Sequence, residues 1–94
     1  MSTVRKLNES ALRGIYDAYM HEAFPPAELK PLAVMLRLME RGRYLCYGYY
    51  RNGRLAAYAF FYRHDSRVLL LDYFAVTPEL RGRGVGSAFL AALD

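Results

Sequence analysis

The chain has 94 residues, a length that supports one small domain. Hydrophobic residues make up 54% and charged residues 23%, and this balance excludes an intrinsically disordered chain. The net charge is +4, but the 11 arginines and 2 lysines are scattered and form no basic run. The charge therefore favours a small anionic ligand over a nucleic acid.

Cysteine content and hydropathy indicate the cellular compartment of the protein. Cys46 is the only cysteine, so no internal disulfide can form, and a reducing, cytoplasmic setting fits. Its apolar neighbours in the sequence favour a small buried side chain over a nucleophile. No apolar run has signal-peptide character or approaches the ~20 residues that span a bilayer. We therefore expect a cytoplasmic protein that does not enter a membrane.

The chain opens with a predicted strand and helix. Residues 3–7 read as a short strand, and Asn8 is placed to cap the helix that follows. Apolar residues recur at helical spacing along one face of this helix, at Leu12, Ile15, Tyr16 and Tyr19. The helix is expected to end before Pro25, since proline interrupts a helix.

A second helix follows a loop or broken helical connection over residues 21–31. It is expected to start between Pro26 and Pro31, because proline is tolerated only in a first turn. Gly42 is a suitable residue to end it. The apolar stripe of this helix is Leu32, Met35, Leu36 and Met39.

The rest of the chain predicts a meander of strands and a final helix. Residues 44–50 and 55–62 pair as a hairpin around Asn52-Gly53, a strong two-residue turn signal. Residues 68–76 form the third strand, so apolar that burial on both faces is expected. A helix then runs from about Gly84 to the end of the chain. No linker interrupts residues 1–94.

The resulting order is β-α-α-β-β-β-α, an α+β fold in which helices pack on an antiparallel meander. Between the last strand and the last helix lies Arg81-Gly-Arg-Gly-Val-Gly86. A Walker A loop requires a lysine after its second glycine, and none follows Gly86. A dinucleotide fingerprint requires a glycine at position 87 or 89, where Ser87 and Phe89 stand.

The loop matches the pattern Arg/Gln-x-x-Gly-x-Gly/Ala after an apolar strand, and it resembles the signature loop of the GCN5-related N-acetyltransferases (GNAT). The stretch from Leu71 through the Thr77-Pro78 turn to Arg81 is similar to the family's fourth strand and the turn after it. The element order is similar to the N-terminal part of the acyl-CoA N-acyltransferase fold. The resemblance covers all 94 residues in topology and is motif-specific over residues 69–93.

The resemblance implies acetyl-CoA as the acetyl donor and an amine as the acceptor, with no metal. Glycines let the backbone approach a diphosphate, and N–H groups at the start of a helix can point at it. The pantetheine arm would lie along the last strand like an added strand. The implied cofactor-binding residues are Phe74, Ala75, Val76, Arg81, Gly82, Arg83, Gly84, Val85, Gly86 and Ser87.

Asp72 is the candidate catalytic residue, because family members often carry an acidic residue at this place that deprotonates the amine. Other members carry the base two residues earlier, where Leu70 cannot serve. A hydrogen-bonded structural role for Asp72 is the alternative. Strand alternation predicts that Asp72 shares a face with Leu70, Phe74 and Val76, opposite Leu71, Tyr73 and Ala75. His21 and Glu22 fall in the connection that lines the acceptor pocket in the family, although such loop residues are more often solvated.

The leading expectation is an acetyl-CoA-dependent N-acetyltransferase, present as an N-terminal fragment of low or no activity alone. The family's general acid is expected beyond residue 94. A non-catalytic acyl-CoA-binding or interaction module is the alternative, and a nucleic-acid binder is a third, weaker interpretation. The open edge of the strand at residues 68–76 also predicts self-association.

Overall fold

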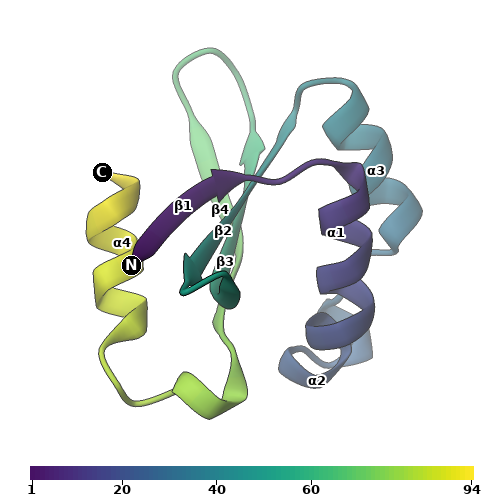
Figure 1. The fold of residues 1–94 in the computed structure, drawn as a ribbon. Helices are drawn as coiled ribbons and strands as arrows, with labels where there is room; N and C mark the ends of the chain where they lie inside the picture. The colour runs from purple at the N-terminus through teal and green to yellow at the C-terminus, as the bar shows by residue number, and fades with distance from the viewer.

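The computed structural model describes residues 1–94, and a four-stranded antiparallel sheet forms its central layer (Figure 1). The strands are β1 (Ser2–Lys6), β2 (Tyr44–Arg51), β3 (Arg54–Arg63) and β4 (Leu69–Val76). They are paired in the order β1-β2-β3-β4. The first strand thus joins the predicted three-stranded meander at the edge formed by β2, and β4 forms the opposite edge.

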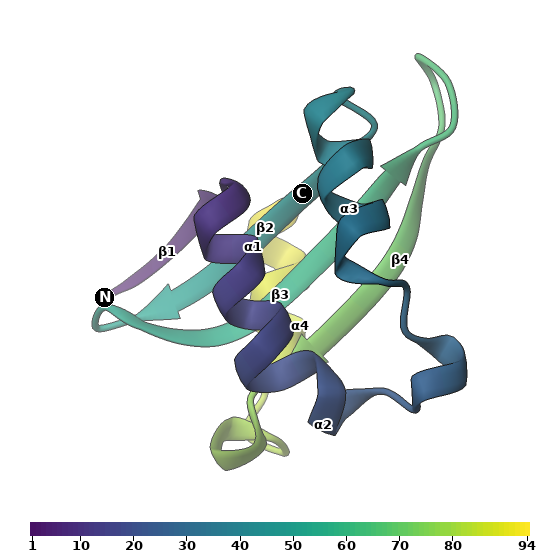
Figure 2. The ribbon, with the colours of Figure 1, turned by 90° about the vertical axis from the view of Figure 1, so that its right-hand side faces the viewer.

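Helices cover both faces of the sheet. On one face lie α1 (Glu9–Ile15), the π-helical turn η1 (Tyr16–Met20), α2 (His21–Ala23) and α3 (Leu32–Glu40). On the other face lies α4 (Val85–Leu93), as Figure 2 shows with α1 and α3 in front of the sheet and α4 behind it. Two short 3₁₀ turns complete the fold, η2 (Pro26–Glu28) and η3 (Pro78–Leu80).

The start of the first helix follows the sequence prediction. The Asn8 side-chain oxygen accepts a hydrogen bond from the Ala11 amide at 2.9 Å, which satisfies one of the free donors of the first turn. The helical segment continues through η1 and α2 as far as Ala23, before the prolines. Over residues 21–31 the structure therefore has the broken helical connection rather than an open loop, with α2 and η2 as separate turns, and the π-helical turn has no counterpart in the apolar pattern.

The second helix ends as its glycine predicts. Gly42 has φ +72°, and its amide donates to the Met39 carbonyl at 3.0 Å. The next amide, of Arg43, donates to the Leu38 carbonyl at 2.9 Å, and the two bonds form a Schellman motif. The helix begins at Leu32, one residue later than expected, because Pro31 is extended and stands before the first turn.

The hairpin between β2 and β3 is also as predicted. Asn52 has φ +52° and Gly53 has φ +79°, so both central residues adopt the left-handed conformation of a type I′ turn. Asparagine and glycine tolerate this conformation better than other residues. The turn sets the register of the first two pairs, Arg51 with Arg54 and Tyr50 with Leu55, and a β-bulge beyond Tyr50 then shifts the register by one residue.

The sheet separates two apolar clusters. On the face of α1 and α3, buried side chains from both helices and the strands include Leu12, Met20, Met35, Tyr44 and Phe60. On the face of α4, Tyr49 stacks on Phe89 with ring centroids 5.1 Å apart and an interplanar angle of 10°. These clusters fix α4, and with it the start of that helix, against the sheet.

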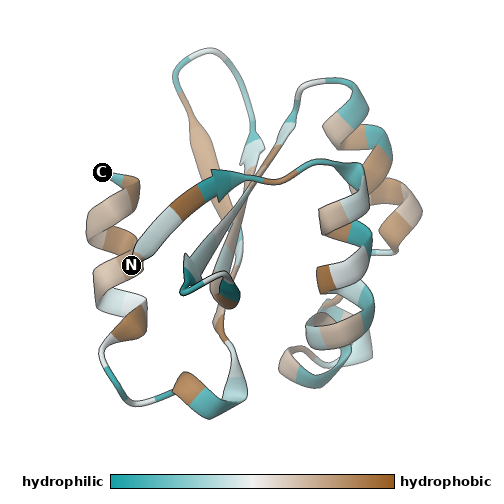
Figure 3. Ribbon diagram, in the orientation of Figure 1, coloured by the Kyte–Doolittle hydropathy of each residue, from teal (hydrophilic) through white to brown (hydrophobic).

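The prediction that the third meander strand is buried on both faces is wrong for its first half. The side chains of Leu69, Leu70 and Leu71 are 48%, 51% and 53% exposed. These residues lie at the free edge of the sheet, and Leu69 lines a pocket beside Leu90 and Leu93 of α4. Figure 3 shows the resulting hydrophobic colour along this part of β4. An apolar run alone does not specify which elements cover it.

The predicted alternation along β4 is also wrong beyond Asp72. Tyr73 pairs with Phe60 and Leu71 pairs with Phe61, so Asp72 has no partner in β3 and forms a β-bulge. As a result Asp72 and Tyr73 both lie on the face of the sheet that α1 and α3 cover, where both contact Lys30 in the connection before α3. Phe74 lies on the opposite face, against Phe89 of α4.

Candidate functional site

The loop between β4 and α4 turns through two glycines. Gly82 has φ +80° and Gly84 has φ +76°, and Gly84 stands immediately before the first residue of α4. An added Cβ at either glycine would have no atom within 4 Å, so the requirement for glycine comes from the backbone conformation. The positive φ angles allow consecutive amides to converge at the start of the helix.

The amides of residues 82–87 donate no hydrogen bond to the backbone or to a side chain of the chain. They include the first turn of α4, where the helix dipole adds positive potential. Arg83, exposed within the loop, forms no ion pair. The loop therefore presents free donors and a positive charge, the features that bind a phosphate group.

The third glycine of the loop lies against the end of β4 and leaves room for a methyl group. A Cβ added at Gly86 would lie 3.5 Å from Val76 Cγ2 and 3.6 Å from Phe74 Cε1, in ordinary contact. Phe74 stacks on Phe89 with ring centroids 5.6 Å apart. The first turn of α4 thus rests on the last residues of β4, which places the free amides beside the end of that strand.

Arg81 holds neighbouring elements together in the structure. Its Nε donates to the Val76 carbonyl at 3.0 Å, and its guanidinium pairs with Glu22 of α2 at 3.1 Å. The Tyr58 hydroxyl is buried without a partner, and burial raises the pKa of Tyr58 to about 12, with Glu22 adding to the rise and Arg81 opposing it. The sequence did not predict that Glu22 pairs with the loop.

Asp72 is bound on two sides. Its carboxylate accepts from Lys30 Nζ at 2.9 and 3.1 Å and from the Tyr44 hydroxyl at 2.5 Å. Burial, and then the hydrogen bond to Asp72, raise the pKa of Tyr44 far above its ordinary value, so Tyr44 acts as a donor. Burial, with Asp72 adding to it, also raises the pKa of the Cys46 thiol to about 12. Cys46 is thus a protonated core side chain, as its neighbours in the sequence indicated.

The connection before α3 is fixed to the bulge. The Tyr73 hydroxyl donates to the Glu28 carbonyl at 2.7 Å and accepts from the Lys30 amide at 2.8 Å. The Tyr16 hydroxyl donates to the Lys30 carbonyl at 2.8 Å. Lys30 and Tyr44 were not singled out in the sequence, because neither belongs to a motif and both meet Asp72 only through the tertiary fold.

Other candidate groups have local roles. His21 packs edge-on against Tyr16, with ring centroids 4.9 Å apart. Asp65 accepts from the amides of Arg67 and Val68 and so forms the turn before β4. No three His, Cys, Asp or Glu side chains gather where they could hold a metal ion. No helix has the length and apolar character needed to cross a membrane.

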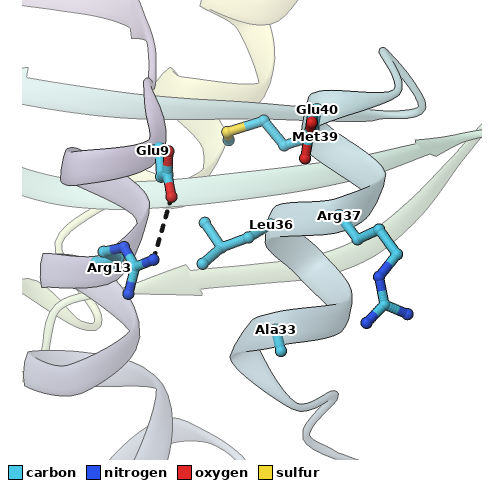
Figure 4. A pocket seen from close by; sticks show the side chains of 7 residues that line it. All are labelled: Glu9, Arg13, Ala33, Leu36, Arg37, Met39 and Glu40. Atoms are coloured by element: carbon cyan, nitrogen blue, oxygen red, sulfur yellow. Dashed lines mark hydrogen bonds and ion pairs between the residues drawn. The ribbon is translucent and has the colours of Figure 1, made fainter.

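A separate pocket lies between α1 and α3 (Figure 4). Leu36 points into it, and the ion pair of Glu9 with Arg13, 3.1 Å long, closes one side. None of the site residues predicted from the sequence lines this pocket. The pocket lies on the outer side of the helices, away from the loop and the bulge, so it is not the candidate site.

Comparisons with solved structures find the same fold in bacterial acetyltransferases. The ribosomal-protein-S18-alanine N-acetyltransferase from Escherichia coli is 26% identical over 99% of this chain and 57% of its own, with a TM-score of 0.73. A putative GNAT acetyltransferase from Bacteroides thetaiotaomicron is 19% identical over 97% of this chain and 53% of its own, with a TM-score of 0.81. The chain thus spans little more than half the length of these two proteins.

A third structure, a predicted acetyltransferase from Clostridium acetobutylicum, was solved with acetyl-CoA. It is 13% identical over 99% of this chain and 71% of its own, with a TM-score of 0.69. No curated protein matches the sequence.

The sequence profile described as the acetyltransferase (GNAT) family matches residues 10–94, which include the loop, the bulged strand and the connection. The order of elements and the glycine loop agree with this match. The chain therefore belongs to the GNAT acetyltransferase family.

Proposed function

We propose that this chain supplies the coenzyme-binding part of an acetyl-CoA-dependent N-acetyltransferase. The observation that carries the proposal is the set of free amides at residues 82–87, at the N-terminus of α4. A diphosphate offers many acceptor oxygens and negative charge, and these donors match it. Arg83 adds a charge that no carboxylate of the chain neutralises through an ion pair.

We propose that the pantetheine arm lies along β4. This strand pairs only with β3, so its outer edge is open to an extended ligand, except at the Val76 carbonyl, which accepts from Arg81 Nε. Residues 74–76 lead directly to the loop through the η3 turn. A coenzyme held by the loop could therefore continue along the backbone of Phe74, Ala75 and Val76 toward the bulge.

The proposed reaction is direct acyl transfer to a primary amine. The neutral amine attacks the thioester carbonyl, a C–N bond forms, the C–S bond breaks, and the leaving thiolate takes up a proton. Asp72 is the proposed acceptor of the amine proton, because its carboxylate lies at the bulge of β4 with its side chain 23% exposed. This role requires Lys30 to leave the carboxylate.

The test is a calorimetric titration of the chain with acetyl-CoA, followed by measurement of thiol release with a panel of primary amines. Arg83→Glu should weaken binding at least severalfold, because it places a carboxylate among the phosphate donors. Arg37→Glu on the exposed face of α3 makes the same charge change outside the site and should bind like the parent chain. The absence of acetyl-CoA binding would overturn the proposal, whereas binding without thiol release would favour a non-catalytic acyl-CoA-binding module.

Two further points belong to this proposal. The exposed edge of β4 supports self-association with a second copy, because unpaired backbone groups and exposed leucines lie together there. A cytoplasmic location is supported by the free, buried Cys46, which suits a compartment that keeps thiols reduced.

A further inference from the structure

We propose that the Lys30 ammonium occupies the subsite that binds the ammonium group of the amine acceptor. The subsite consists of the Asp72 carboxylate, the Tyr44 hydroxyl and the ring of Tyr73. In this view Lys30 competes with the acceptor from within the chain. The identification of the ligand as the acceptor rests on the proposed function, whereas the binding of a primary ammonium at Asp72 can be tested without it.

The groups around Lys30 Nζ are those that recognise an ammonium. Both Asp72 oxygens accept from it, at 2.9 and 3.1 Å, and the Tyr73 ring centroid lies 5.9 Å away. A carboxylate beside an aromatic ring attracts a cation by charge and by the ring quadrupole. The Tyr44 hydroxyl donates to Asp72 Oδ2, the oxygen that also accepts the shorter bond from Lys30, and so helps to fix the carboxylate. This carboxylate keeps its place whichever ammonium it binds.

The bulge brings these groups together. Because Asp72 has no partner in β3, it and Tyr73 face the same side of the sheet, toward the connection before α3. A regular strand would place the carboxylate and the ring on opposite faces. The bulge thus brings the two groups of the subsite that belong to β4 to one face of the sheet.

The backbone of Lys30 does not depend on its ammonium. Its amide donates to the Tyr73 hydroxyl and its carbonyl accepts from the Tyr16 hydroxyl, each at 2.8 Å. The connection therefore keeps its place when Nζ moves away. The Lys30 side chain is 36% exposed, so it can swing into solvent. An ion pair this exposed contributes little to stability and can be exchanged for another at low cost.

Competition by Lys30 should lower the affinity for an ammonium ligand by a measurable factor. A ligand that binds only when Lys30 has left has its apparent affinity reduced by the fraction of molecules in which the subsite is open. For an ion pair of the strength usual at such exposure, removal of the competitor raises affinity by up to about fivefold. Lys30→Met and Lys30→Gln should each produce this gain, while Asp72→Asn should abolish ammonium binding.

The test uses the full chain labelled with carbon-13 at the lysine ε-carbons, where Lys6 and Lys30 give the only 2 lysine signals. The chain is titrated with n-butylammonium, and with n-butanol as an uncharged probe of the same length. We expect n-butylammonium to shift the Lys30 signal toward that of a solvated lysine and to leave Lys6 unchanged. Lys6→Met is the matched control, and its affinity for n-butylammonium should equal that of the parent chain.

The outcomes separate this proposal from the proposed function. If Lys30→Met and Lys30→Gln remain folded and bind n-butylammonium no more tightly than the parent, or if n-butanol has the same effect, the subsite is refuted. Acetyl-CoA binding is measured on the same samples and reports on the function independently. With turnover, Lys30→Met should lower the KM for the amine and leave the KM for acetyl-CoA unchanged, whereas a purely structural lysine would raise or not affect both.

Discussion

Glycine has two different tasks within the loop before α4. At positions 82 and 84 the backbone has positive φ, and an L-residue there brings its Cβ close to the following carbonyl whatever space surrounds it. At Gly86 the backbone is helical, and a methyl group would meet Val76 and Phe74 at normal contact distance. The pattern Gly-x-Gly/Ala therefore has a physical basis in this chain, because alanine suits only the last of these positions.

These differences predict opposite effects on stability. Gly84→Ala should lower the free energy of unfolding by about 1–2 kcal/mol, the usual penalty for an L-residue in the left-handed region. Gly86→Ala is the matched control and should be neutral or should stabilise by up to about 1 kcal/mol, because alanine is the better helix former. Urea unfolding of both variants measures the difference. Equal losses in both would show that the positive φ of Gly84 does not explain the requirement for glycine there.

Asp72 shows where sequence reasoning about single residues reached its limit. Its candidacy came from the resemblance to the family, but its partners Lys30 and Tyr44 are 42 and 28 positions away in the chain. No local spacing relates residues that only the tertiary fold brings together. The bulge was equally hidden, because it depends on the register with β3, and one unpaired residue was enough to place Phe74 on the face opposite to the one predicted.

At the scale of elements, the sequence predicted helix ends and turns correctly where residues close in the chain stabilise them. Three local signals were each predicted from residue type. Asn8 accepts a hydrogen bond from a free amide of its helix, and Gly42 and the Asn52-Gly53 turn reverse the chain through positive φ angles. The glycine loop was recognised because its residue pattern resembles the signature loop of the family. The π-helical turn over residues 16–20 was missed, since the apolar stripe continues through it without a change of residue class.

The role of Asn8 as a helix cap can be tested by substitution. Asn8→Ala removes the acceptor of the Ala11 amide and should lower the free energy of unfolding by about 1 kcal/mol. Ser10→Ala, two positions later and exposed, removes a side-chain hydroxyl that makes no hydrogen bond in the chain and should change stability by no more than a few tenths of that amount. Thermal and urea unfolding of the pair decide the point, and equal effects would mean that Asn8 does not act as a cap.

At the scale of the whole molecule, the layering of helices on an antiparallel sheet followed from the order of the elements. The coverage of β4 did not follow from that order. An apolar sequence predicts that a strand is buried, but it does not identify the element that buries it. Phe74 and Val76 lie under α4, while Leu69, Leu70 and Leu71 remain half exposed at the edge. The same strand therefore supplies the wall beside the loop and an apolar surface that a monomer leaves in water.

This surface predicts concentration-dependent dimerisation through β4. Two copies related by a two-fold axis can pair the first halves of their β4 strands, around residues 69–71, in antiparallel orientation. This pairing satisfies the unpaired backbone groups there, buries the exposed leucines of both copies and leaves residues 74–76 free for the coenzyme. Leu70→Lys should abolish the dimer in sedimentation analysis, since a charge on an edge strand opposes pairing and the leucine is already 51% exposed. Ala18→Lys adds the same charge on an exposed position of η1 and should leave the dimer intact. A chain that stays monomeric as its concentration rises would show that the twist or the Asp72 bulge of β4 protects the edge by itself.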